Sequence, residues 1–112
     1  MNLTSKKCVP CQGGILPLKE GEIKLLLDKI GKDWKAIDGH HLEREFKFKD
    51  FNEALDFTNK VGKIAEGEGH HPDIYLSWGK VKVIIYTHKI NGLHMNDFIL
   101  AAKIDELKLK EK

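Results

Sequence analysis

Two runs of strand-forming residues separated by a two-residue gap constrain the fold of this chain most strongly. The first run extends from Asp73 to Trp78, the second from Val81 to His88, and only Gly79-Lys80 lies between them. A gap of this length is typical of a tight β-hairpin. The sequence therefore predicts two antiparallel strands that lie side by side in one sheet.

Strand pairing in this hairpin brings three histidines together. A two-residue loop pairs Trp78 with Val81, and counting outward along the ladder then places His88 opposite His71. His70 is the preceding residue. We therefore expect three imidazoles at one end of the hairpin. A one-residue slip in register would change only which of His70 and His71 shares a face with His88.

The residues around the tandem pair His70-His71 are also polar or conformationally restricted. Glu66 lies four residues before His70, a spacing that places both side chains on one face of a helix. Pro72 disfavours a helical conformation at His71, so the pair marks the exit from a helix into a strand. Asp97 precedes an apolar run, where it is either an N-terminal helix residue or a ligand contact.

The helix that leads into His70 has a distinct beginning. Asp50 is a favourable N-cap, and Glu53 three residues later completes an Asx version of the capping box. Apolar and small residues then recur at helical spacing. They are Ala54, Leu55, Thr58, Val61, Ile64 and Ala65. We expect this helix to carry Glu66 and His70 to the edge of the sheet and to pack across it.

The other segments supply two further helices and two further strands. Apolar and charged residues alternate in one of these strands, which predicts one face toward water, and the turn residues Asp38-Gly39 precede it. In chain order, these elements are a helix over Glu20–Ile30 capped by Gly31, a short strand at Trp34–Ala36, a strand over Leu42–Phe48 and a helix over Asp97–Leu109. The sequence therefore predicts an α+β domain, with a four-stranded antiparallel sheet and about three helices packed on one face.

Length and composition favour a single domain with one site. The chain has 112 residues, and its 19 basic and 17 acidic residues give a formal net charge of +2. This balance offers no general argument for attraction to nucleic acid or membrane. The sequence also has no apolar core of signal-peptide length near its start and no run of about 20 apolar residues. We therefore expect a cytoplasmic protein with no nucleic-acid or membrane partner.

Residues 1–18 are interpreted as an N-terminal arm that precedes a single domain over residues 19–112. The arm contains Cys8-x-x-Cys11, a spacing found in redox pairs, in half-sites for zinc and in cysteines with neither role. A common structural zinc site needs a second cysteine pair, which the sequence lacks. We therefore favour an arm that packs on the domain.

A second tandem pair, His40-His41, directly follows the Asp38-Gly39 turn. Unlike His70-His71, it has no glutamate at helical spacing before it and no proline after it. Titratable residues indicate a functional site mainly when they are clustered. We therefore interpret His40-His41 as part of a surface turn.

The pattern Glu66-x-x-x-His70-His71-Pro72, an aromatic-containing strand, His88 and Asp97 together resemble the signature of the pterin-4a-carbinolamine dehydratases. The resemblance also covers Lys49-Asp50-Phe51 and the span from about Trp34 to the C-terminal helix. The segment Cys8-x-x-Cys11-x-Gly13-Gly14 departs from the shorter members of this family.

This resemblance implies an activity and a set of roles. The family dehydrates 4a-hydroxytetrahydropterins to quinonoid dihydropterins, which recycles the tetrahydropterin cofactor, and the reaction needs no bound metal or redox cofactor. An imidazole suits the two proton transfers, because its ordinary pKa of about 6.5 keeps both protonation states accessible near neutrality. The implied catalytic residues are His70, His71, His88 and Glu66, with His70 and His88 as acid and base and Glu66 as the carboxylate that orients His70. The implied substrate-binding residues are His71, Pro72 and Asp97.

The resemblance also implies a homodimer or homotetramer. A four-stranded sheet leaves two edges open, and we expect the long, Val/Ile-rich run from Val81 to Tyr86 to be an open edge of the kind that pairs with another chain. We therefore expect two-fold symmetric assembly with the site contained within each subunit.

Two alternatives to the dehydratase stay open at this point. His70, His71 and His88 could hold zinc with one open position, although adjacent side chains in an extended segment point to opposite faces. The other alternative is a protein-interaction module, because some animal members of the family also act as dimerisation cofactors of a transcription factor.

Overall fold

The computed structural model describes Leu3 and residues 16–110. For residues 109 and 110 it describes the backbone alone. The predicted arm over residues 1–18 therefore falls largely outside the described residues, and Cys8 and Cys11 fall outside them altogether. The boundary between an arm and a domain at residues 18 and 19 stays a prediction.

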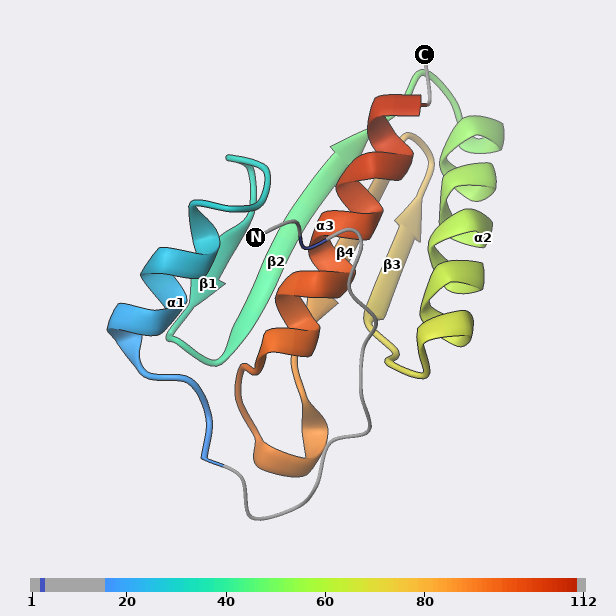
Figure 1. The fold of residues 1–112 in the computed structure, drawn as a ribbon. Coiled ribbons are helices and arrows are strands. Elements are labelled where there is room, and N and C mark those ends of the chain that lie inside the picture. Colours follow the sequence, from blue (N-terminus) through green and yellow to red (C-terminus); the bar gives the residue numbers. More distant parts are fainter. Residues whose placement is uncertain (1–2, 4–15, 111–112) are drawn as a thin grey trace.

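The described residues form eight elements in chain order. They are α1 (Glu20–Leu27), β1 (Lys35–Ile37), β2 (His41–Lys47), α2 (Phe51–Glu68), β3 (Asp73–Ser77), β4 (Lys80–Ile85), the 3₁₀ turn η2 (His88–Ile90) and α3 (Met95–Lys110). The four strands form one antiparallel sheet in the order β1-β2-β4-β3. Figure 1 shows α3 in front of the middle of this sheet, with α2 beside it. The predicted α+β class is confirmed, and no helix in the described part of the chain could span a membrane.

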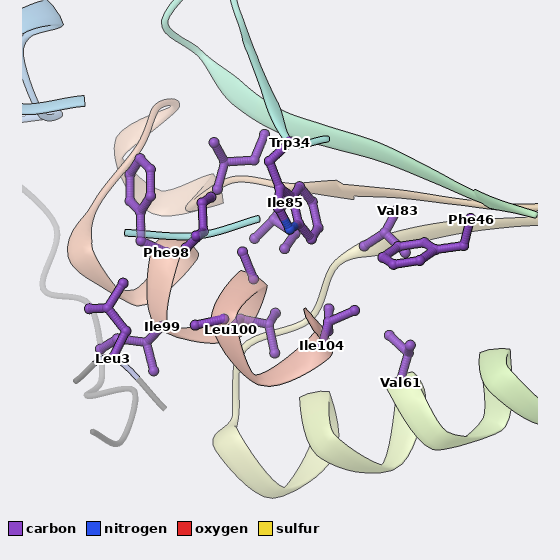
Figure 2. Packing of buried hydrophobic residues seen from close by; sticks show 14 of the residues in the cluster. Leu3, Trp34, Phe46, Val61, Val83, Ile85, Phe98, Ile99, Leu100 and Ile104 are labelled. Carbon is purple, nitrogen blue, oxygen red and sulfur yellow. The ribbon is translucent and has the colours of Figure 1, made fainter. Parts of the chain in front are cut away.

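Alternating burial along the strands explains why the helices cover one face. Val81, Val83 and Ile85 of β4 are fully buried, whereas the residues between them are only partly buried. Figure 2 shows Val83 and Ile85 packed toward α3, with Val61 of α2 pointing into the same core. Since a strand shows alternate side chains to opposite faces, the core forms on one side of the sheet.

The central helix begins as its sequence indicates, but its buried stripe is rotated. The Asp50 side chain accepts a 2.9 Å hydrogen bond from the Glu53 N–H. The buried residues of α2 are Ala54, Phe57, Val61 and Ala65, so the predicted stripe missed Phe57. It also wrongly included Leu55, which is 37% exposed. The Phe57 ring sets the contact face, because its centroid lies 4.7 Å from that of Phe46.

The first helix is shorter than predicted. It ends at Leu27, with Asp28 as its C-cap, and so stops before Ile30 and Gly31. Ile30 is nevertheless buried, because the next turn folds it back into the core. The turn at Asp38-Gly39 is confirmed as the link between β1 and β2, and both residues have the positive φ angles that tight hairpins favour.

The β3–β4 hairpin is present, but its register differs from the predicted one. Ser77 pairs with Lys80, so the loop is Trp78-Gly79 and not Gly79-Lys80. A Cβ on Gly79 would lie 2.9 Å from the Phe48 carbonyl oxygen, so this close approach favours glycine at the turn. The register differs by two positions, which leaves every side chain on its predicted face but no longer places His71 opposite His88.

The prediction that the Val81–Tyr86 run forms an open sheet edge is wrong. This run lies in β4, which pairs with β2 on one side and with β3 on the other. The alternate residues of this run are buried because β4 is a central strand covered on one face by α2 and α3. The edges of the sheet are β1 and β3.

Candidate active site

Candidate site residues gather at one end of the sheet. The end of α2, the start of β3, the end of β4 and the start of α3 all lie at the lower end of the molecule in Figure 1. They come together because α2 and β4 both run toward this end, and β3 and α3 both start from it. Residues far apart in the sequence therefore share one location.

His70 is placed by the end of α2. Gly69 adopts a left-handed conformation with φ 66°, which terminates the helix. The backbone N–H of His70 still reaches back to the Ala65 carbonyl oxygen at 3.2 Å. Pro72 then starts the extended segment before β3, as the sequence indicates.

Asp97 connects three segments at this end. Its carboxylate is fully buried. Its Oδ1 lies 2.6 Å from His70 Nε2, while its Oδ2 accepts hydrogen bonds from the Thr87 hydroxyl at 2.9 Å and from the His94 N–H at 2.8 Å. Asp97 also lies in the first turn of α3, where the helix dipole favours a negative charge.

These contacts determine which nitrogen of His70 is available for chemistry. An ionised carboxylate only accepts hydrogen bonds, so the proton between Asp97 and His70 is assigned to Nε2. In the neutral ring the other nitrogen, Nδ1, is then unprotonated. No other described residue engages His70 Nδ1, and the side chain is 13% exposed. The contact with Asp97 therefore orients the His70 ring and leaves Nδ1 as the nitrogen that can accept a hydrogen bond in the neutral form.

The predicted contact between Glu66 and His70 is replaced by a different pair. Glu66 Oε1 lies 2.7 Å from Nε2 of His71, and the two side chains are 81% and 62% exposed. The reason is the left-handed Gly69, which turns the chain after α2 so that His70 faces α3. The carboxylate in contact with His70 is Asp97, for which the resemblance implies a role in substrate binding.

His88 lies in η2 and not in a strand, contrary to the predicted hairpin geometry. The strand β4 ends at Ile85, and the chain reverses where Thr87 forms an isolated bridge with Gly92. The His88 ring packs on Tyr86, with ring centroids 4.3 Å apart. His88 is joined to the rest of the site through the preceding residue, because Thr87 donates to Asp97.

Sequence reasoning missed Thr87. Thr87 is buried and donates a hydrogen bond to the carboxylate of Asp97. Its position directly before His88 in the chain is the one sequence feature that points to it. Tyr86 contacts not only His88 but also His40, whose ring centroid lies 4.6 Å away. The pair interpreted as a surface turn therefore lies beside the candidate site.

A metal centre from His70, His71 and His88 has no support in this geometry. Nε2 of His70 faces Asp97 and Nε2 of His71 faces Glu66. Across Leu3 and residues 16–110, no group of three or more His, Cys, Asp or Glu side chains is arranged to hold a metal ion.

Comparisons with known proteins agree on one family. The family model described as pterin 4 alpha carbinolamine dehydratase matches residues 16–107. Two similar proteins are both named "Putative pterin-4-alpha-carbinolamine dehydratase". The one from Alkaliphilus metalliredigens is 57% identical over 94% of this chain and 95% of its own length. The one from Methylococcus capsulatus is 55% identical over 95% of this chain and 93% of its own length.

A solved structure has the same fold. It is the Brucella melitensis protein titled transcriptional coactivator/pterin dehydratase, and it aligns with a TM-score of 0.76 at 33% identity. The alignment covers 81% of this chain and 97% of the Brucella chain.

Proposed function

The chain belongs to the pterin 4 alpha carbinolamine dehydratase family of hydro-lyases, and on that premise we propose that its histidines dehydrate a 4a-hydroxytetrahydropterin by acid–base catalysis. In this reaction the C4a–O bond breaks and the hydroxyl leaves as water after receiving a proton. The neighbouring N5–H gives up its proton, and a C4a=N5 double bond forms in the quinonoid dihydropterin. One base and one acid are sufficient.

His70 is proposed as the base. Its Nε2–H is directed at Asp97, so Nδ1 is the nitrogen that can take the N5 proton. Asp97 contributes by holding one tautomer and one ring orientation. The single observation that carries the proposal is this buried carboxylate, which binds His70 and also Thr87, the residue before His88.

His88 is proposed as the acid that protonates the departing hydroxyl. It lies on η2 at the same end of the sheet, is exposed, and follows the residue bound to Asp97. His71 and Glu66 form an exposed pair next to His70, which suits contact with the polar pterin. Pro72 fixes the backbone between this pair and β3.

Activity measurements on single variants test these roles. His70→Ala and His88→Ala are each expected to lower kcat by about 10²-fold or more, the usual scale for a positioned acid or base. His41→Ala is the control, with kcat within about threefold of wild type, a change that corresponds to well under 1 kcal/mol. Activity that survives both site substitutions would refute the mechanism. A loss of activity on chelation that zinc restores would refute acid–base catalysis by these residues alone.

The proposed physiological role is recycling of a tetrahydropterin cofactor in the cytoplasm. The reaction removes the carbinolamine that a pterin-dependent hydroxylation leaves behind. A gene for such a hydroxylase in the same genome would support this role. If the genome encodes no pterin-dependent hydroxylase, the carbinolamine would have to come from another reaction, and this role would lose its support.

Assembly into a homodimer or homotetramer is a further part of the proposal. With β4 in the middle of the sheet, the edge strand β3 is the candidate for pairing with a second copy. Two large aromatic side chains at this edge are exposed, Tyr75 by 56% and Trp78 by 68%. Light scattering at micromolar concentration is expected to show a dimer or tetramer, and a monomer would contradict the assembly.

A further inference from the structure

His88 lies on a short turn that is anchored at both ends. Thr87 and Gly92 exchange backbone hydrogen bonds, with the Thr87 N–H 2.9 Å from the Gly92 oxygen. Asn91, which ends η2, has a left-handed backbone with φ 49°. The Thr87 side chain fastens the first end of this turn to Asp97. A three-residue 3₁₀ turn has few internal hydrogen bonds, so its orientation depends on such outside contacts.

His40 contacts the residues on both flanks of this turn. Its ring packs on Tyr86, just before the turn, with centroids 4.6 Å apart and planes inclined by 40°. Its Nε2 lies 2.9 Å from Oδ1 of Asn91, just after the turn. One side chain of the β1–β2 connection therefore bridges the two flanks of η2. Tyr86 in turn contacts the His88 ring at 4.3 Å, so the three rings form a continuous series.

The orientation of His40 is fixed at both ring nitrogens. The Asn91 side-chain oxygen is an acceptor, so Nε2 of His40 carries the proton in this pair. In the neutral ring Nδ1 of His40 is then unprotonated. It lies 3.1 Å from Nδ1 of His41 and accepts a hydrogen bond from it. His41 therefore supports His40, whereas its own ring is farther from Tyr86, at 6.5 Å between centroids.

We infer that His40 is a positioning residue for His88, acting through Tyr86 and Asn91. This inference rests on the proposed role of His88 as the acid. An acid must meet the leaving oxygen at hydrogen-bonding distance, and a displacement of about 1 Å can cost up to about 10² in rate. His88 itself is exposed, so the turn and the Tyr86 ring, and not burial, keep its imidazole in place. His40 does not touch the reacting atoms.

The test compares variants of His40 that keep or remove one contact each. His40→Ala removes both, and His40→Phe keeps a ring against Tyr86 but loses the hydrogen bond to Asn91. We expect His40→Ala to lower kcat about tenfold with KM changed less than twofold, and His40→Phe to recover part of the loss. His41→Ala removes only the hydrogen bond to Nδ1 of His40 and is the intermediate case, expected within about threefold of wild type because both contacts of His40 with the turn remain.

A double-mutant cycle and a spectroscopic measurement separate this inference from the proposed function. In the His88→Ala background, His40→Ala is expected to cause no further loss of kcat, because the residue it positions is gone. The ring-proton NMR resonances of His88 are expected to shift in His40→Ala, since they lie beside the Tyr86 ring. Additive losses, or unchanged His88 resonances, would overturn the positioning role. Shifted resonances together with a fully active His88→Ala would uphold the positioning and refute instead the proposed acid.

Discussion

Two aspartates of α3, Asp97 and Asp105, each accept hydrogen bonds from three donors, but the donors differ in their chemistry. Asp97 accepts from His70, Thr87 and the His94 backbone. Asp105, about two turns later, accepts from the Arg44 guanidinium, the Trp34 indole N–H at 2.7 Å and the Gly31 N–H at 2.8 Å. Both carboxylates join α3 to segments distant in the sequence.

The difference between them lies in the partner that can exchange a proton. An arginine stays protonated in proteins and an indole N–H only donates, so the Asp105 network is fixed in one state. An imidazole can gain or lose a proton near neutral pH, so the Asp97 network can take part in a reaction. The three donors around the partly buried Asp105 thus make a structural contact. The three donors around the buried Asp97 include an imidazole, which is why we propose a catalytic role only for Asp97.

Among the carboxylates compared, the largest expected effect comes from Asp97→Asn. The amide keeps the size of the side chain but has one acceptor oxygen in place of two, so it no longer holds the Nε2–H tautomer of His70. We expect kcat to fall by about 10²-fold, measured by the rate of quinonoid dihydropterin formation. A kcat within threefold of wild type, with the variant folded by circular dichroism, would show that Asp97 does not support His70 in catalysis.

Asp105→Asn is expected to affect stability and not activity. The Arg44 side chain is 14% exposed and would lose its closest carboxylate, keeping Asp33 at 3.4 Å. We expect the free energy of unfolding to fall by about 2 kcal/mol, measured by urea denaturation, with kcat of the folded enzyme within twofold. A tenfold loss of kcat in a stable Asp105→Asn protein would erase the contrast between the two aspartates.

The smallest expected effect comes from Glu66→Gln, which extends the comparison to an exposed carboxylate. Glu66 and His71 are both largely exposed, and exposed ion pairs contribute little and are screened by salt. We expect KM to rise about threefold with kcat lowered less than twofold. High salt should raise the wild-type KM toward that of the variant. Asp56→Asn, which removes an exposed α2 carboxylate paired with Lys60, is the control and should leave KM unchanged.

Most of the fold was predictable from the sequence because the relevant signals are local. Alternating apolar and charged residues predicted β2, two strand-forming runs with a short gap predicted the β3–β4 hairpin, and the capping residue Asp50 predicted the start of α2. The errors occurred where local signals leave a choice. The α2 stripe was rotated because Phe57 packs against Phe46, and the hairpin loop differs by one residue at the point where the Phe48 N–H donates to the Gly79 carbonyl oxygen. Both are contacts between segments.

The candidate site divides in the same way. The sequence by itself placed His70, His71 and Pro72 at the junction between a helix and a strand, because proline and glycine restrict the backbone of their neighbours. Only the tertiary structure decided that His70 meets Asp97 while Glu66 meets His71, and that His88 stacks on Tyr86 beside His40. Asp97 is 27 residues away from His70 in the chain. Such a pairing depends on how α3 packs on the sheet, which is set by the burial of its apolar face and not by the residues next to either partner.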